Sequence, residues 1–193
     1  KIPVNGGKHL EYDIIGENNK STLESDTLIY NTETKIATIL GPTYIYHSDS
    51  TIIYSELGWY NSINDKSQLL KTPLINHGEG KQLKGDTIFY DKLMGIGEAF
   101  HNVELIDSLK KTRIYGHYGY YKEDGEIGLV TDSAMMIEYS QKDTTYIHGD
   151  TLFSFAHGDN EKMVLAYHNV RLYNNTFQSV CDSLTFLSGD SIL

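Results

Sequence analysis

Residues 85–107 read "GDTIFYDKLMGIGEAFHNVELID", and both ends of this stretch recur elsewhere in the chain. Its beginning returns as "SDTLIY" at 25–30 and "GDTLFS" at 149–154, so the shared aspartates lie 60 (86 − 26) and 64 (150 − 86) positions apart. Its end, "AFHNVELI" at 99–106, returns as "AYHNVRLY" at 166–173. Repetition at a fixed period is typical of stacked repeat architectures. The stretch therefore predicts a fold built from repeated units of just over 60 residues.

Shorter echoes divide this unit further. They are "SDSTII" at 48–53, "TDSAMM" at 131–136, "CDSLTF" at 181–186 and "GDSIL" at 189–193. We expect the 60-residue unit to consist of strand-sized steps. The third unit needs a three-residue insertion to keep the register, and we place it within "SFAHGDNEKM" at 154–163.

The repeated elements alternate between apolar and polar residues, as strands with one buried face do. In "NVELI", Val103 and Leu105 share one face and Glu104 occupies the other. No long segment shows the i, i+3, i+4, i+7 spacing of a helix, so helices should be absent or short. Strands too small to bury their own faces favour a solenoid or an elongated folded sheet, with a closed sandwich as the alternative.

Composition narrows the class of protein. The 193 residues make one domain or one stretch of a repeat array, and the net charge of −10 excludes nucleic acid as a partner because phosphates need clustered cations. Cys181 is the single cysteine, so the sequence has no intrachain disulfide and no cysteine-based zinc site. Apolar runs are too short for a membrane span, and no signal core precedes the first strand. We expect either a cytoplasmic protein or one whose signal has been removed.

The repeated polar residues are better explained by structure than by chemistry. We interpret His101 and His168 as stacked on neighbouring strands by position, without a metal. Each repeated aspartate, such as Asp86 or Asp150, is followed by threonine and stands alone, unlike a calcium loop, so we expect it to cap a turn by bonding backbone amides. No G-x-S-x-G elbow is present. The sequence thus predicts no catalytic residue, no metal site, no cofactor and no enzymatic activity.

The repeats resemble those of a known protein family. The runs "SDTLIYNTETKIATILGPTYIY" (25–46), "GWYNSINDKSQLLKTPLI" (58–75) and 85–107, with "LAYHNVRLY" and "CDSLTF" further on, resemble the OstA-like proteins, relatives of the periplasmic LptA component of lipopolysaccharide export. The hallmark is a strand of the form (A/G)-D-x-L-x-Y followed by G-N-V-x-L. This sequence departs from it where His101 and His168 replace the glycine before Asn-Val.

The resemblance covers about residues 22–193, with repeat units at approximately 25–84, 85–148 and 149–193. Residues 1–21 fit least and are expected to be a terminal strand, the tail of a preceding repeat, or a segment introduced for expression.

The resemblance implies an all-β fold: an elongated, twisted antiparallel β-jelly-roll, or β-taco, built from repeated strand units with an open apolar groove. It implies a Gram-negative periplasmic module that binds the lipid A part of lipopolysaccharide and moves it from the inner towards the outer membrane. Partners would be other lipopolysaccharide-transport proteins joined by edge-strand addition, or further copies joined end to end.

On strand parity, ten apolar side chains should face this groove. They are Leu28, Tyr30, Ile45, Ile88, Tyr90, Val103, Leu105, Leu152, Val170 and Leu172. The same residues would serve equally as the ordinary core of a structural β-solenoid spacer or adhesin segment. A carbohydrate-active β-solenoid would instead need carboxylates about 5 to 10 Å apart on an exposed face.

Overall fold

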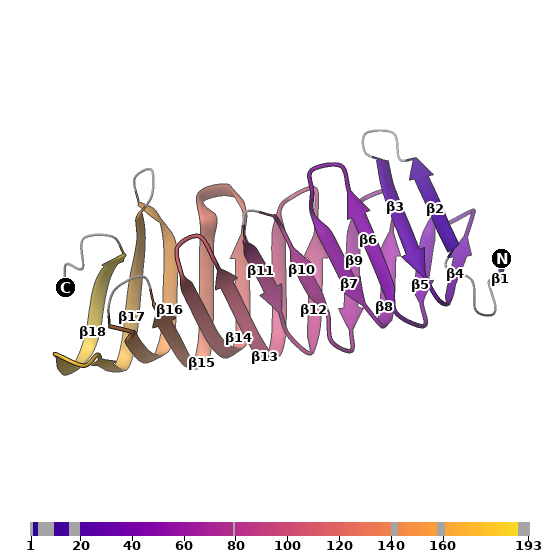
Figure 1. The fold of residues 1–193 in the computed structure, drawn as a ribbon. Helices are drawn as coiled ribbons and strands as arrows, with labels where there is room; N and C mark the ends of the chain where they lie inside the picture. The colour runs from indigo at the N-terminus through magenta and orange to yellow at the C-terminus, as the bar shows by residue number, and fades with distance from the viewer. Residues whose placement is uncertain are drawn as a thin grey trace.

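The computed structural model describes residues 2–3, 10–15, 20–78, 80–139, 143–157 and 161–188. The molecule is elongated, with the N-terminal and C-terminal strands at opposite ends and the strands lying across the long axis (Figure 1). Within these ranges, every regular element is a strand except one 3-10 turn, η1 (Asp124–Glu126).

The strands differ in length along the molecule. The first twelve are short: β1 (Ile2–Pro3), β2 (Leu10–Ile15), β3 (Lys20–Ser25), β4 (Leu28–Asn31), β5 (Ile36–Ile39), β6 (Thr43–His47), β7 (Ile52–Ser55), β8 (Leu57–Asn61), β9 (Lys66–Leu70), β10 (Leu74–Asn76), β11 (Lys81–Lys84) and β12 (Thr87–Asp91). The last six are long: β13 (Ile96–Asp107), β14 (Thr112–Lys122), β15 (Ile127–Glu138), β16 (Thr145–His157), β17 (Glu161–Tyr173) and β18 (Gln178–Ser188).

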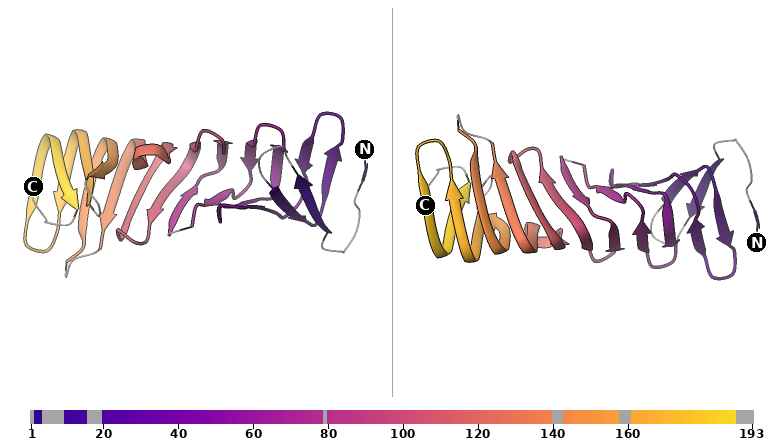
Figure 2. Two further views of the ribbon diagram at one scale, coloured as in Figure 1. Left: turned by 90° about the horizontal axis from the view of Figure 1, so that it is seen from above. Right: turned by 90° about the horizontal axis from the view of Figure 1, so that it is seen from below.

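The described strands form one antiparallel sheet that is folded along its length into two facing walls. The first wall contains β1, β4, β5, β8, β9 and β12, and the second contains β2, β3, β6, β7, β10 and β11. The walls join at β13, whose first half pairs with β12 and whose second half pairs with β11. From β13 to β18 each strand crosses both walls. We call each such crossing of the two walls a course, and Figure 2 shows the courses following one another along the axis.

Each crossing bends at a corner between the walls. In β13 the corner is His101–Asn102, with φ angles of 57° and 49°, and the pairing with β14 shifts between Phe100 and Val103. Asp26 and Asp86 also lie at corners, 60 residues and four crossings apart, which gives 15 residues per crossing. One sequence period thus corresponds to four courses of the folded sheet.

The corner geometry corrects our interpretation of the repeated histidines. His101 lies on β13 and His168 on β17, four strands apart, so they are separated by about 19 Å rather than stacked on neighbouring strands. Both are exposed and have positive φ. The repeated His-Asn pair is therefore a left-handed corner, a conformation that asparagine tolerates better than most residues.

The repeated aspartates also act differently from our expectation. Asp86 accepts a hydrogen bond from the Asn102 side-chain amide at 2.9 Å, and Asp150 accepts one from Asn169 at 2.9 Å. In these two units the carboxylate links one corner to the next, because both corners lie on the same exposed ridge.

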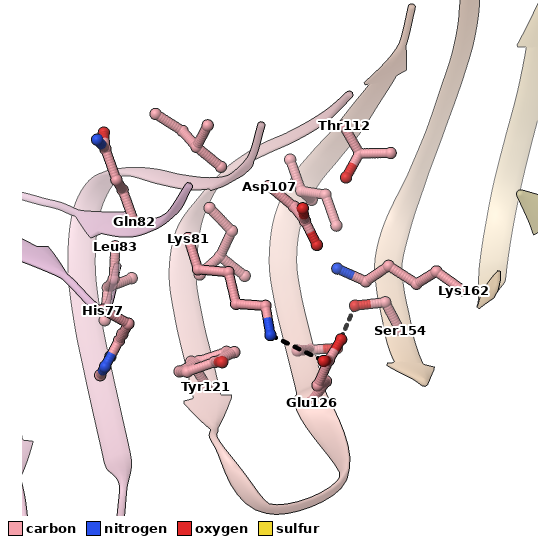
Figure 3. A pocket seen from close by; sticks show the side chains of 14 residues that line it. His77, Lys81, Gln82, Leu83, Asp107, Thr112, Tyr121, Glu126, Ser154 and Lys162 are labelled. Atoms are coloured by element: carbon pink, nitrogen blue, oxygen red, sulfur yellow. Dashed lines mark hydrogen bonds and ion pairs between the residues drawn. The ribbon is translucent and has the colours of Figure 1, made fainter. Parts of the chain in front are cut away.

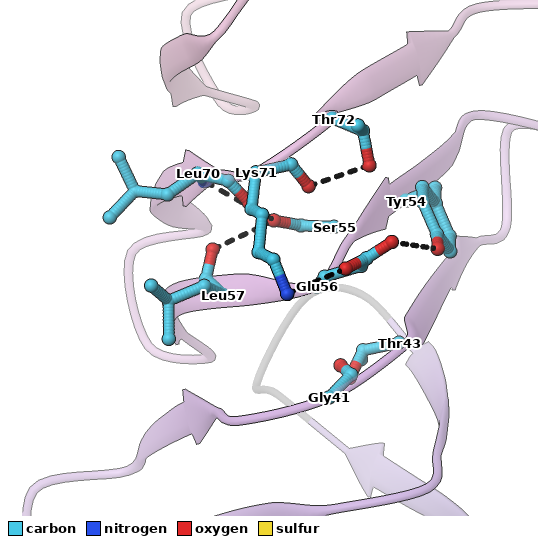
Figure 4. Close-up of polar contacts among 9 residues, drawn as sticks. All are labelled: Gly41, Thr43, Tyr54, Ser55, Glu56, Leu57, Leu70, Lys71 and Thr72. Carbon is cyan, nitrogen blue, oxygen red and sulfur yellow. Dashed lines mark hydrogen bonds and ion pairs between the residues drawn. The ribbon is translucent and has the colours of Figure 1, made fainter.

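Near the N-terminal end the corners are joined through Ser55 (Figure 4). Its hydroxyl lies 2.8 Å from the carbonyl oxygens of both Leu57 and Leu70 and accepts a hydrogen bond from the Leu70 N–H at 3.2 Å. On the outer side Lys71 pairs with Glu56 at 3.0 Å. In this part of the molecule each crossing is made by two short strands with a corner between them. The contacts of Ser55 and Lys71 join the corner between β7 and β8 to the corner between β9 and β10.

Three sequence expectations touch residues outside the described ranges. "GDSIL" at 189–193 lies outside them, as do residues 158–160 of the segment that should carry the insertion. The flanking strands β16 and β17 are each 13 residues long, against 11 or 12 in β13 to β15. Of residues 1–21, β2 pairs with β3 along its whole length.

Candidate functional site

The interior of the second wall is an unbroken apolar row. Each member is paired in register with the next across neighbouring strands, and all ten are buried. The row is Leu23, Ile45, Ile53, Ile75, Leu83, Leu105, Ile114, Met136, Ile147 and Leu172. It arises because antiparallel pairing in a constant register places every inward position beside another inward position.

The first wall presents a facing row close to the corners. Its members are also paired in register from strand to strand. They are Leu28, Ile39, Gly58, Leu69, Ile88, Ala99, Gly119, Val130, Leu152, Ala166 and Leu184. Small residues stand where the walls approach most closely: a Cβ on Gly119 would lie 2.5 Å from Val103 Cγ1 of the other wall.

All ten sequence-predicted groove residues belong to this interior or pack against it, and Tyr30 alone among them is only half-buried. Their contact with a lipid stays a prediction. Sequence reasoning missed equivalent inward residues such as Ile53, Ile75 and Ile147, although the same alternation marks them. It also missed the polar residues at the seam opposite the corners, such as Lys81 and Glu126, because they are not part of a repeated motif.

Midway along the molecule the walls enclose a cavity of about 30 Å³ (Figure 3). Leu83, Leu105 and Ile114 line it from the second wall, and Gly128 and Ser154 line it from the first. The space exists because a glycine and a serine face larger aliphatic side chains. It is large enough for about two water molecules but not for an acyl chain.

The seam opposite the corners, which we call the mouth, is where the hairpins of the two walls meet. Here Asp49 of the second wall pairs with Lys92 of the first, and His77 Nδ1 of the second lies 3.0 Å from Glu123 Oε1 of the first. Burial alone would raise the pKa of Asp49, but hydrogen bonds from Lys92 and Thr51 outweigh it and lower the pKa to about 2. Both contacts hold the walls together across the seam.

A third contact closes the mouth beside the cavity. Glu126, in the turn between β14 and β15 of the first wall, accepts hydrogen bonds from Lys81 Nζ and Lys110 Nζ of the second wall, each at 2.8 Å. Burial raises the pKa of Glu126, and the two ammonium groups lower it further than burial raises it, to about 2. The carboxylate is therefore ionised at neutral pH and bridges two lysines.

The described residues contain no group of three or more His, Cys, Asp or Glu side chains arranged to hold a metal ion. In the same part of the chain, no helix is long and apolar enough to pass through a membrane.

Comparison with protein-family models and with curated proteins finds no match. Comparison with solved structures finds LptH, the LptA-homologous periplasmic component of the lipopolysaccharide transport device from Pseudomonas aeruginosa. The two chains are 14% identical, the match covers 59% of this chain and 80% of LptH, and the TM-score is 0.51. At this identity the likeness shows the fold alone. The expected all-β, LptA-like jelly-roll of antiparallel strands is thus confirmed.

Proposed function

We propose that this chain is a non-enzymatic periplasmic module that binds lipopolysaccharide through the acyl chains of lipid A. It passes the lipid along as part of a bridge from the inner to the outer membrane. The observation that carries this proposal is the inward apolar row of the second wall, which runs without a charged residue from Leu23 to Leu172. A lipid tail needs such a continuous path, and the likeness in fold to a lipopolysaccharide-transport component supports it.

Binding requires the walls to part, because the cavity between them at Leu105 is only about 30 Å³ and buried apolar side chains pack around it. Each methylene group removed from water contributes about 0.8 kcal/mol, and the sum over an acyl chain offsets the free energy lost when contacts between the walls open. Several fully buried chains would nevertheless sum beyond the roughly 20 kcal/mol at which affinities saturate. Binding that tight would prevent release of the lipid. If the acyl chains instead pass from one apolar site to another, the net change in free energy is small, and the partner proteins set the direction of transfer.

The ends of the sheet suit assembly with other transport proteins. Within the described residues β18 pairs only with β17, and β2 pairs only with β3. Edge strands with free backbone groups add further strands readily. We expect partner proteins, or further copies of the chain, to join in this way.

Site-specific photo-crosslinking tests the lipid path. A photoreactive phenylalanine at Leu105, which lines the cavity, or at Val103 should label lipopolysaccharide, whereas one at Glu104 on the outer face should not. Glu104 is the matched control because it lies between the two test positions on β13. Labelling from Glu104 alone would contradict the proposal, and circular dichroism checks that each variant is folded.

The second candidate function is a structural β-solenoid spacer with no ligand. The packing of the buried apolar residues favours it, because the cavity beside Leu105 is only about 30 Å³. A spacer predicts no labelling from Leu105, Val103 or Glu104, so the same experiment separates the two functions.

A further inference from the structure

The cavity at the centre of the molecule is apolar at one end and charged at the other. Leu83, Leu105 and Ile114 form its inner part, and two lysines and two acidic residues surround its outer part: Lys81, Lys162, Asp107 and Glu126. Figure 3 shows the Lys81 and Lys162 ammonium groups directed towards the space beside Asp107 and Glu126. In a chain with a net charge of −10, a place where lysines balance the acidic residues can accept an anion if one of the carboxylates moves away.

Lys81 and a neighbouring lysine, Lys110, already hold an anionic group. The Glu126 carboxylate lies 2.8 Å from both Lys81 Nζ and Lys110 Nζ, whose side chains are 21% and 18% exposed. Partly buried charges of this kind are screened less by salt than surface charges. A lysine ammonium group acts as a point charge and can bind phosphate oxygens as well as carboxylate oxygens.

Glu126 is held by a short turn, and its side chain is 30% exposed. Gly125 and Glu126 have φ angles of 77° and 48°, and a positive φ is uncommon for a residue other than glycine. The Glu126 N–H donates to the Glu123 carbonyl oxygen at 3.0 Å, which holds the turn in place. Rotation of the Glu126 side chain away from the lysines would uncover both ammonium groups.

His77 brings a buried polar atom to the lining of the same cavity. The His77 side chain is 8% exposed, and its Nδ1 contacts Glu123. Its Nε2 is buried, and among the described residues it has no hydrogen-bond partner. Buried polar atoms are usually paired with protein groups or ordered water, so a polar group that enters the cavity can pair with this nitrogen.

We propose that Lys81 and Lys110, with the cavity behind them, form a binding site for an anionic amphiphile. Its phosphate or carboxylate head takes the place of the Glu126 carboxylate on the two ammonium groups. Its acyl chain enters between the walls past Leu105. The site rests on the proposed function, because it needs an interior that admits an acyl chain. It adds a head-group position on that path and makes Glu126 a resident competitor that closes the mouth when no ligand is bound.

Equilibrium binding of three probes tests the site in the full chain. Dodecyl phosphate, below its micelle-forming concentration, carries both head and chain; dodecyl maltoside carries the chain with an uncharged head; inorganic phosphate carries the charge alone. Dodecyl phosphate should bind tightest. The double variant Lys81→Gln/Lys110→Gln should bind it at least about ten-fold more weakly, because the loss of even one charge-assisted hydrogen bond corresponds to about that factor. It should bind dodecyl maltoside as wild type does.

The variant Glu126→Gln should bind dodecyl phosphate about ten-fold more tightly, because the competing carboxylate is gone. Lys66→Gln is the matched control, since Lys66 is an exposed lysine that pairs with Asp91 at 3.0 Å and does not line the cavity. It should bind all three probes as wild type does. Unfolding of each variant in urea confirms that the protein tested is folded.

Three outcomes would overturn the site. Unchanged binding of dodecyl phosphate by the double lysine variant would show that the lysines do not hold the head group. Weaker or equal binding by Glu126→Gln would show that Glu126 does not compete. Binding of inorganic phosphate as tight as that of dodecyl phosphate would make the ligand a free anion. If both dodecyl probes fail to bind wild type, the proposed function fails with it, whereas equal binding of both removes only the anion site.

Discussion

At the scale of single residues, the fold depends on small side chains where the two walls come closest. Gly119 of β14 faces Val103 of β13 beside the corner, and the valine methyl group occupies the space that a side chain at Gly119 would need. The repeated "HNV" motif has a structural role at this corner. Its histidine and asparagine adopt the positive φ angles that turn the chain, and its valine is buried between the walls directly after the turn.

Gly119→Ala should therefore destabilise the protein by about 1 to 3 kcal/mol, because the new Cβ overpacks against Val103 Cγ1 at 2.5 Å. Urea unfolding measures the loss. Gly149→Ala is the control, since its Cβ would have no neighbour closer than 3.4 Å, and its effect should stay within about 0.5 kcal/mol. Adding Val103→Ala should recover part of the loss, and strict additivity of the two changes would contradict the close contact.

At the scale of elements, the hairpins of opposite walls are held together by side-chain contacts rather than by backbone pairing. The strand ladders run along each wall, whereas the mouth is crossed by the contacts of Asp49 with Lys92, His77 with Glu123, and Glu126 with two lysines. Side-chain contacts of this kind depend on pH, and ladder hydrogen bonds do not.

Acid should therefore weaken the mouth before it affects the ladders. The pKa values of Asp49 and Glu126 in the folded protein are about 2, below their ordinary values of 3.8 and 4.5. Because folding lowers these pKa values, both carboxylates stabilise the folded protein above about pH 5, and the contribution is lost as pH falls towards 2. The urea midpoint of wild type should decline over this range.

Glu126→Gln provides the check on this assignment. The variant should be less stable than wild type at pH 7, and the difference should shrink towards pH 2, where the wild-type carboxyl group is also becoming neutral. A difference that stays constant with pH would mean that the Glu126 charge does not stabilise the folded state.

At the scale of the whole molecule, each course of the sheet touches chiefly the courses next to it. Pairing runs from neighbour to neighbour along the axis, from β2 and β3 at one end to β17 and β18 at the other. Stability in such arrays is approximately a sum of local terms. A weakened course should loosen its neighbours and leave distant courses unaffected.

Hydrogen exchange read by mass spectrometry tests this locality. Ile147→Ala removes a buried side chain from β16 and should speed exchange in β15 to β17, with little change in β5 to β8. Ile45→Ala, at the equivalent place on β6, should give the reverse pattern. Faster exchange along the entire molecule for both variants would indicate one cooperative unit instead.

The local design is encoded in the order of the amino acids. Alternation marked the strands and the inward side chains, and the 60-residue period carried the stacking, because both are written into neighbouring residues of the chain. The sequence pattern misplaced His101 and His168, since nothing local distinguishes a strand position from a left-handed corner occupied by histidine. Which polar groups meet across the mouth depends on how the two walls fold together. Lys81, Lys110 and Glu126 come from different strands and turns, and they meet because the sheet folds back on itself, so the binding site depends on contacts between walls that no segment specifies alone.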